Sequence, residues 1–236
     1  MTFLQICRRL ARACGMTNSS TIPATVTGQS GNLADCVDWA ADAYNELQVS
    51  GGDWRWMRSR FTVNTVASTE TYAATSCTDS RLSATISRFS HWLITDRYNP
   101  PKAYLTSGSI GSQYHLQFID WDTFCALYKI GIISEGSPVH ISIDPQDNIV
   151  LGPTPNDVYT ITGEYQMSAQ NLAEDDDEPE MPSDFHMLVV YEAMVKYAGD
   201  QLSEEAMGRA MREGGRLKSQ LLIRQKPHFR KARPMA

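Results

Sequence analysis

Residues 31–65 read GNLADCVDWAADAYNELQVSGGDWRWMRSRFTVNT, and within this stretch a helical pattern changes into a strand pattern. The apolar side chains of its first half share one helical stripe, made of Leu33, Val37, Ala40, Tyr44 and Leu47 and widened by Cys36 and Ala41. Asn32 can cap the start of this helix, and the glycine pair 51–52 can end it. After an aromatic corner, residues 58–65 alternate as a strand does.

Four further helices are predicted from caps and apolar spacing. Thr2 and Gln5 have the form of a capping box ahead of a helix that runs to about residue 15, and Asp120 can cap a short helix before residue 131. Residues 182–184 open a helix that ends near residue 199, and residues 203–205 open the last one. The apolar stripe of the last helix is Met207, Met211, Leu217, Leu221 and Leu222. The glycines at 214 and 215 weaken this pattern and count against a continuous last helix.

Between these helices the apolar period changes to two, which predicts a β-rich region. The expected strands are residues 61–66, 71–75, 91–95, 103–106, 113–119, 139–143, 149–151 and 158–167. The strongest local pattern is residues 138–157, where two apolar runs are joined by Asp144-Pro-Gln-Asp-Asn148. These turn-forming residues predict a β-hairpin.

The composition is that of an ordinary soluble protein, with 42% hydrophobic and 20% charged residues. No stretch approaches the roughly 20 apolar residues that span a bilayer, and residues 1–14 lack the pattern of a signal peptide, so we expect cytosolic synthesis and no membrane contact. The five cysteines are scattered without a Cys-x-x-Cys pair, which predicts reduced and mostly buried thiols.

Charge divides the chain into an acidic body and a basic end. The whole chain has 21 Lys and Arg against 27 Asp and Glu, yet residues 209–236 hold nine bases and one acid, Glu213. The last eleven residues, KPHFRKARPMA, contain two prolines and little to bury, so we expect them to be disordered in isolation. A basic, aromatic segment of this kind suits a peptide that becomes ordered in the groove of an acidic partner, protein or nucleic acid.

An acidic segment precedes the C-terminal helices. Glu174, Asp175, Asp176, Asp177, Glu178 and Glu180 put six acids in seven positions. A solvated loop is one interpretation, and a docking or channel-facing surface is the other. The spaced ligands and glycine turn of a calcium loop are missing.

The motifs of common enzymes do not occur in the sequence. There is no Walker loop, dinucleotide-binding glycine motif, zinc-protease motif or nucleophile elbow, and the Ser-Gly run at 107–112 is interpreted as a hairpin loop. His91, His115 and His140 fall in expected strands but far apart in sequence, so ordinary hydrogen-bonded histidines are favoured over a metal site. We therefore predict no enzyme, no catalytic or metal-binding residue and no cofactor.

Two groups of motifs resemble the tailed-phage head-to-tail adaptor, or connector, proteins. They are Trp39 and Tyr44 with Asp53, Trp54 and residues 55–61, followed downstream by residues 149–153, 163–165, Pro182 and residues 184–186. The resemblance implies a non-enzymatic virion protein in the neck between capsid and tail, assembled in the bacterial cytoplasm. It implies a ring, probably of twelve copies, beneath the portal protein, with a lower surface for tail or nozzle proteins and a channel that genomic DNA crosses without sequence-specific binding.

The resemblance and the charge pattern together suggest site residues. The expected portal-docking residues are Arg224, Lys226, His228, Phe229, Arg230, Lys231 and Arg233. The candidates for a subunit interface or the channel are Trp54, Arg55 and Trp56, where Trp and Arg suit a contact, and Glu174, Asp175, Asp176, Asp177 and Glu178. The alternative function is a nucleic-acid-binding module that uses the basic tail, with Trp54 and Trp56 as a base-stacking platform. A hydrolase in the β-rich region has no positive support.

The expected fold class is α+β. Terminal helices form a bundle, a central antiparallel β-rich lobe is inserted between them, and an extended arm ends the chain. The expected divisions are helices in 1–57, the β-rich lobe with one short helix in 58–168, an acidic loop in 169–182, helices in 183–224 and the portal-docking tail in 225–236.

Overall fold

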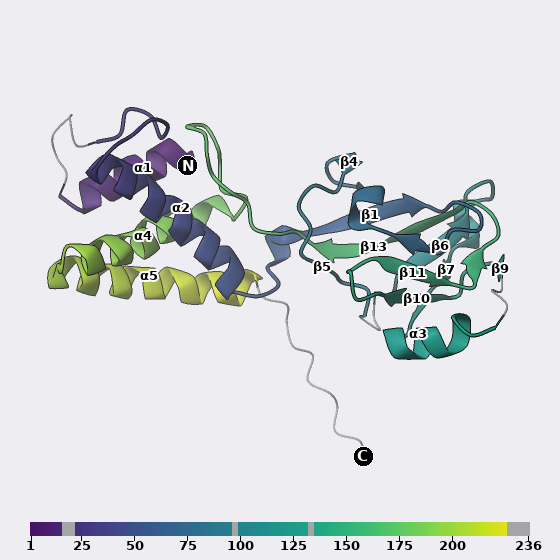
Figure 1. The fold of residues 1–236 in the computed structure, drawn as a ribbon. Coiled ribbons are helices and arrows are strands. Elements are labelled where there is room, and N and C mark those ends of the chain that lie inside the picture. The colour runs from purple at the N-terminus through teal and green to yellow at the C-terminus, as the bar shows by residue number, and fades with distance from the viewer. Residues whose placement is uncertain (16–21, 96–98, 132–134, 226–236) are drawn as a thin grey trace, which may run out of the picture. The chain divides into compact units, whose positions relative to one another are not determined.

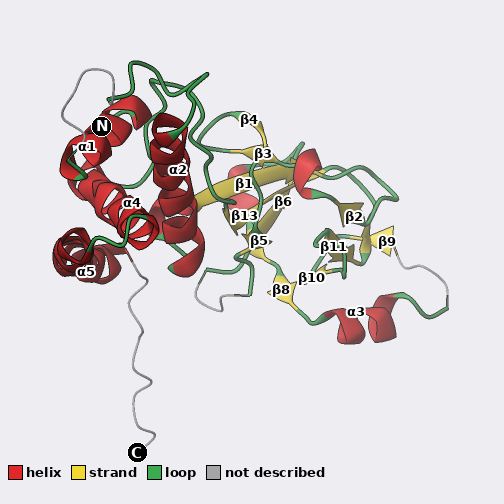
Figure 2. Cartoon of the chain, turned by 60° about the vertical axis from the view of Figure 1, so that its left-hand side comes forward, coloured by secondary structure: helices red, strands yellow, loops and turns green. Residues whose placement is uncertain are grey.

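The computed structural model describes residues 1–15, 22–95, 99–131 and 135–225 and divides into two compact units (Figure 1). The helical unit comprises Met1–Met57 and Ala169–Ala236, and the β unit comprises Arg58–Ser168. The strands of the described residues all lie in the β unit, which also holds the short helix α3, and the other α-helices lie in the helical unit (Figure 2). The chain is therefore a mixed α+β protein, as the sequence predicts.

Four α-helices and two 3₁₀ turns make up the described part of the helical unit. They are α1 (Phe3–Ala13), α2 (Asn32–Ser50), η1 (Arg55–Met57), η4 (Ser183–Phe185), α4 (His186–Asp200) and α5 (Glu204–Gln225). The predicted capping box is present at α1, because the Thr2 side chain accepts from the Gln5 backbone and the Gln5 side chain accepts from the Thr2 backbone.

Helix α2 differs from the prediction at its start. Asn32 is the first helical residue and caps nothing with its side chain, because the cap position belongs to Gly31 at φ 56°. The helix ends where expected, with Gly51 as its cap and Gly52 in the left-handed region at φ 76°. Its buried face is made of Cys36, Ala40, Ala43, Tyr44, Leu47 and Gln48.

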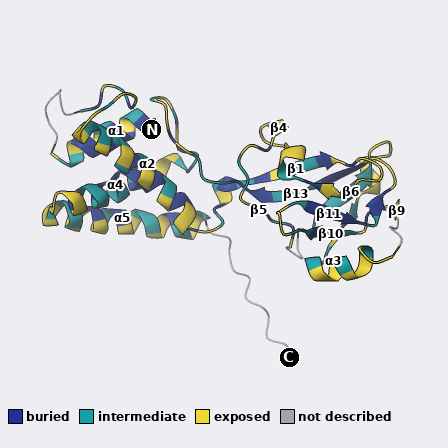
Figure 3. Ribbon diagram, viewed as in Figure 1, coloured by how far each residue is buried: buried dark blue, intermediate teal, exposed yellow. Residues whose placement is uncertain are grey.

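These helices bury apolar faces against one another, with exposed side chains on their outer surfaces (Figure 3). Helix α4 supplies the largest share, with Leu188, Val189, Val190, Ala193, Met194 and Ala198 all buried. Trp39 of α2 meets Tyr197 of α4 edge to face, with ring centroids 5.7 Å apart. Helix α4 contacts α1, α2 and α5, so it is the central element of the unit.

The last helix, α5, is continuous from Glu204 to Gln225 in spite of its two glycines. Gly214 is buried, and a Cβ atom placed there would lie 3.3 Å from Tyr191 Cβ on α4. Glycine thus lets the two helices approach closely, which offsets its low helix propensity. The predicted apolar stripe is wrong in part, since Met211 is 64% exposed and only Leu221 of that stripe is fully buried.

A pair of glutamines closes the helical unit where the chain leaves it and returns. Gln48 Nε2 donates to the Gln170 carbonyl at 3.0 Å, and Gln170 N donates to Gln48 Oε1 at 2.7 Å. The Gln170 side chain also accepts from Tyr44 Oη at 2.8 Å and from Glu180 N at 3.0 Å. Gln48 is 2% exposed and Gln170 is half-buried, so these bonds are partly shielded from water, and they join segments 122 residues apart.

The β unit is built around the long antiparallel pair β1 (Arg58–Asn64) and β13 (Tyr159–Gln166). The larger sheet has the order β4-β3-β1-β13-β6-β7, with β5 also paired to β13. Its other strands are β3 (Thr78–Asp79), β4 (Ala84–Thr85), β5 (His91–Trp92), β6 (Lys102–Leu105) and β7 (Tyr114–His115).

The second sheet has the order β2-β11-β10-β8, and β12 pairs with β9. Their bounds are β2 (Thr71–Tyr72), β8 (Gln117–Phe118), β9 (Glu135–Gly136), β10 (His140–Ile143), β11 (Ile149–Gly152) and β12 (Thr154–Pro155). Strands β10 and β11 form the predicted hairpin, with the Asp144 carboxylate accepting from the backbone N–H of Gln146 and of Asn148. The remaining elements are α3 (Trp121–Tyr128), capped by Asp120 as predicted, η2 (Ala74–Ser76) and η3 (Ile110–Ser112).

Several strand predictions need correction. The expected strand 113–119 is two short strands in different sheets, β7 and β8, which Leu116 separates as a buried residue. The alternation predicted over residues 58–65 is confirmed as β1, but the extension of this strand to residue 66 is wrong, because β1 ends at Asn64 and Val66 is 61% exposed. Tight turns therefore cut the period-two pattern into shorter pieces than the spacing indicates.

Alanine substitutions at the two adjacent glycines of α5 test the close approach. Gly215→Ala should raise the free energy of unfolding by about 1 kcal/mol, since a Cβ there meets nothing within 4 Å. Gly214→Ala should gain clearly less, or lose stability, because its Cβ presses on Tyr191. Urea unfolding followed by circular dichroism measures both, and equal gains at the two positions would contradict this packing.

Candidate interaction surfaces

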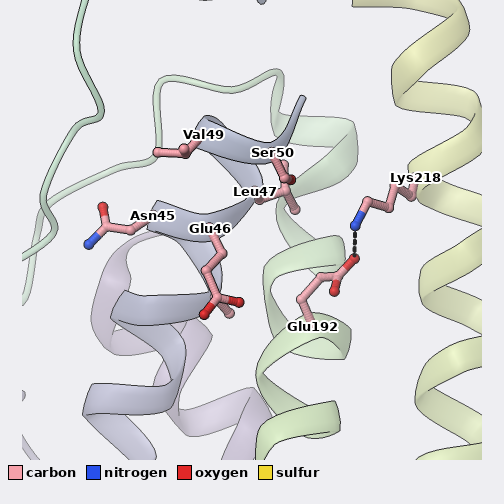
Figure 4. Close-up of a pocket in the computed structure, with 8 residues that line it drawn as sticks. Asn45, Glu46, Leu47, Val49, Ser50, Glu192 and Lys218 are labelled. Carbon is pink, nitrogen blue, oxygen red and sulfur yellow. Dashed lines mark hydrogen bonds and ion pairs between the residues drawn. The ribbon is translucent and has the colours of Figure 1, made fainter. Parts of the chain in front are cut away.

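An open groove of about 460 Å³ lies in the helical unit beside the C-terminal end of α2 (Figure 4). It is lined by Ala43, Asn45, Glu46, Leu47, Val49, Ser50, Glu192 and Lys218. Val49 is 74% exposed at its edge, and Lys218 Nζ reaches Glu192 Oε1 at 3.0 Å across α4 and α5. Apolar groups with charged pairs at the margin are typical of contact surfaces between proteins.

The predicted aromatic corner is a packed structure. Trp54 is 1% exposed, and its Nε1 donates to the carbonyl oxygens of Leu47 and Gln48 at 3.2 and 3.0 Å. A Cβ at Gly51 would lie 1.7 Å from the Trp54 ring, so only glycine fits there. Trp56 stacks on Trp54 with ring centroids 4.4 Å apart. Trp54 therefore serves the core of the helical unit, which does not leave its ring free for base stacking.

The outer part of this corner is accessible. Arg55 is exposed and Trp56 is half-buried. These two residues keep the chemistry that suits a subunit contact, a cation beside an aromatic surface. Their role at an interface stays a prediction.

Two acids of the predicted acidic cluster hold the local backbone in place. Asp175 Oδ1 accepts from Val26 N at 2.6 Å and from Thr25 Oγ1 at 3.0 Å. Asp177 Oδ2 accepts from the backbone N–H groups of Ala173 and Glu174 at 2.7 and 2.8 Å. These backbone hydrogen bonds hold the pKa of Asp177 below its ordinary value.

The loop is also joined to the start of α1 through its backbone. Phe3 N donates to the Asp177 carbonyl at 2.7 Å, and Leu4 N donates to the Asp175 carbonyl at 3.2 Å. These bonds satisfy two of the free N–H groups of the helix, and the acids favour its positive end. The other acids, Glu174, Asp176 and Glu178, are exposed, so they are the members of the cluster that a partner could reach.

The predicted portal-docking residues lie mostly outside the described residues. These are Lys226, His228, Phe229, Arg230, Lys231 and Arg233. Arg224 lies in the last turn of α5, where its Nη1 is 3.3 Å from Asp184 Oδ2 and its guanidinium lies over the Phe185 ring at 5.5 Å. Arg224 thus contacts the start of η4 from the end of α5. Because this ion pair is exposed, it contributes little to the stability of the fold on its own.

The sequence does not reveal a buried polar cluster around Asp79 in the β unit. Asp79 is fully buried and accepts from Ser59 Oγ at 2.9 Å, from Tyr165 Oη at 2.5 Å and from the backbone of Arg81 and Leu82. Burial works against the ionised form, but these donors outweigh it and lower the pKa of Asp79, while burial and the carboxylate raise that of Tyr165. The cluster fixes β3 and the following turn on the β1–β13 pair, and only the tertiary register brings it together.

The histidines and cysteines outside these clusters have ordinary surroundings in the part of the chain that the structure describes. No group of three or more His, Cys, Asp or Glu there could hold a metal ion. His140 Nδ1 bonds Tyr128 Oη at 2.6 Å, and His115 is exposed on β7. Burial raises the pKa of Cys36 to about 11 and of Cys77 to about 12, so these thiols stay protonated and unreactive at neutral pH.

His186 is a buried histidine that links three parts of the helical unit. Its Nε2 lies 3.0 Å from the Met181 carbonyl, and its Nδ1 lies 2.7 Å from the Met1 amine, so Nδ1 accepts when the ring is neutral. It is 3% exposed. Burial lowers the pKa of His186, and the nearby amine adds to that effect.

These observations define the chain as a mixed α+β protein with candidate contact surfaces on its helical unit. The family model described as SU10 adaptor protein matches residues 1–231, nearly the whole chain. The chain therefore belongs to the SU10 adaptor protein family, and its role is that of a structural phage adaptor. None of the curated proteins matches it. Among the helices of the described residues, none is long and apolar enough to cross a membrane.

Removing the Asp175 carboxylate should destabilise the helical unit. Asp175→Ala leaves the Val26 N–H and the Thr25 hydroxyl without their acceptor, which should cost about 1–3 kcal/mol of unfolding free energy. Asp176→Ala is the matched control, because Asp176 is exposed, and it should change stability by less than about 0.5 kcal/mol. Urea titrations measure the free energy of unfolding of both variants. Equal values for the two would contradict a structural role for the Asp175 carboxylate.

His186 should make the helical unit less stable in mild acid. Its pKa is lowered in the fold, so its contribution is complete above the ordinary value of 6.5 and is lost as pH falls from there toward the folded pKa. The midpoint of urea unfolding, followed by the helical dichroism signal, should fall between pH 7.5 and 5.5. His186→Gln should lower stability at pH 7.5 but flatten this dependence, and an unchanged slope in the variant would assign the effect to other groups.

Proposed function

We propose that this adaptor forms a ring of twelve copies beneath the portal, in the neck between capsid and tail. Membership of the SU10 adaptor protein family carries the proposal, since it supplies the class of structural role. Portal protein and tail or nozzle proteins are the proposed partners on its two sides. Identical chains that repeat one heterologous contact close into a ring when the rotation permits.

The basic C-terminal segment is the proposed portal-docking arm. Nine of the last 28 residues are Lys or Arg, and α5 ends at Gln225, directly before the residues proposed to dock. Ordering about eleven residues costs roughly 1–2 kcal/mol each in backbone entropy, so one arm would bind modestly. Twelve arms engaged at once would hold firmly through effective concentration.

The net charge of −6 suits a channel that DNA crosses. The basic end would be occupied by the portal, which leaves an acidic body facing the remaining surfaces. A wall of the same sign as the phosphate backbone would let genomic DNA slide without sticking.

Sedimentation of the purified chain, alone and mixed with the portal ring, tests the proposal. The full chain should join the portal as a defined multimer, whereas a chain that ends at Arg224 should not. The opposite result, no portal binding together with DNA affinity that falls steeply with added salt, would favour the nucleic-acid-binding alternative.

Charge reversal in the arm tests the docking residues separately. Changing Arg230, Lys231 and Arg233 to Glu should abolish binding to the portal ring and leave the melting temperature of the chain unchanged. Arg212→Glu with Arg216→Glu is a control on the exposed side of α5 and should leave portal binding intact. Undiminished binding by the arm variant would reject the assignment of the arm.

A further inference from the structure

Three arginines surround an open hollow of about 410 Å³ between the end of α1 and the start of α5. Arg9, Arg12 and Arg209 line it, with Ala13 and Met187. All three arginines are exposed, and in the described residues none pairs with a carboxylate within 4.0 Å. Arg9 donates to the sulfur of Met187 at 3.6 Å, whereas the neighbouring Arg8 donates to two backbone carbonyls. Glu205 lines the adjoining pocket beside Ala13 and Arg209 without an ion pair to these arginines. Among the described residues, the hollow thus holds positive charge that no ion pair neutralises.

The complementary surface lies at the other end of α1. There the exposed carboxylates Glu174, Asp176 and Glu178 stand on the loop that is joined to the N-terminus of α1 (Figure 1). Arg12 follows Leu4 by eight residues, which is about 12 Å along a helix axis. Glu178 Oε1 lies 3.9 Å from the Met1 amine of its own copy, whereas no ion pair within the described residues involves Glu174 or Asp176. The loop and the hollow thus lie at opposite ends of α1, and charge remains available on both.

We infer that, in the proposed ring, the arginine hollow of one copy receives the acidic loop of the next copy. The inference rests on the proposed function and names the contact that would build the ring. Arginine suits this task because its planar guanidinium binds carboxylates through two parallel hydrogen bonds. A contact between unlike surfaces at opposite ends of one helix is heterologous, the type that closes rings.

The loop is well prepared for such a contact. Asp175 and Asp177 bind backbone N–H groups within their own copy, which fixes the loop and turns its other acids outward. Little conformational entropy is lost when a loop that is already ordered binds. A second copy of this chain is favoured as the occupant because the exposed acids of the loop and the exposed arginines of the hollow carry opposite charge and every copy presents both.

Complementary charge reversal tests the contact. One variant reverses the hollow, Arg12→Glu with Arg209→Glu, and the other reverses the loop, Glu174→Lys with Asp176→Lys. Each alone places like charges against each other at every contact, so each should need at least tenfold more chain than the unaltered protein to form multimers by sedimentation. An equal mixture should assemble again, with the two variants in a 1:1 ratio. Arg212→Glu with Arg216→Glu is the control and should assemble normally.

The outcomes separate the two proposals. If the unaltered chain assembles and each reversed variant assembles equally well, the contact is wrong and the ring stands. If variants with normal circular dichroism and melting temperature fail to form multimers both alone and mixed, the loop is not the occupant of the hollow. The same conclusion holds if the variants still form rings but no longer bind the portal. If the unaltered chain forms no multimer with or without the portal, the ring proposal fails and this inference fails with it.

Discussion

The helical unit depends on the double hydrogen bond between Gln48 and Gln170. Its helices come from two segments of the chain, one that ends at Met57 and one that begins at Ala169, with the whole β unit between them. Burying two amides is unfavourable unless their polar atoms are satisfied, and here the side chain of each residue bonds the partner segment. The hydrogen bonds between Gln48 and Gln170 fix the position of α2 relative to the returning chain. The acidic loop, α4 and α5 come after Gln170 in the sequence, so their placement begins from this contact.

The acids of the acidic loop fall into two groups, one that accepts hydrogen bonds from the backbone and one that is exposed to solvent. Asp175 and Asp177 face inward and satisfy backbone N–H groups, and the loop backbone meets the N–H groups at the start of α1. The exposed acids Glu174, Asp176 and Glu178 gain a fixed direction because their neighbours are anchored in this way. Charge that would be self-repelling in a free loop becomes a shaped surface, at the helix end where negative charge is most favourable.

Local patterns in the sequence predict the elements that local physics determines. The capping box at Thr2, the cap at Asp120 and the β10–β11 hairpin all arise from residues within five positions of one another, and all are correct. The Asp79 cluster, the glutamine bridge and the arginine hollow join residues more than 80 positions apart or depend on helix packing, so no spacing rule detects them. Gly214 shows the same limit, because helix propensity disfavours a glycine within a helix, whereas the close approach of Tyr191 on α4 favours one there.

The chain enters and leaves the β unit at neighbouring positions on two paired strands, β1 and β13. Arg58, its first residue, is the register partner of Gln166 near its end, so the ends of a 111-residue insertion lie one strand spacing apart. A segment with adjoining ends can be lengthened, shortened or replaced without moving the helices to which it is attached. The surface of the β unit can therefore change in sequence and size while the packing of the helical unit is kept.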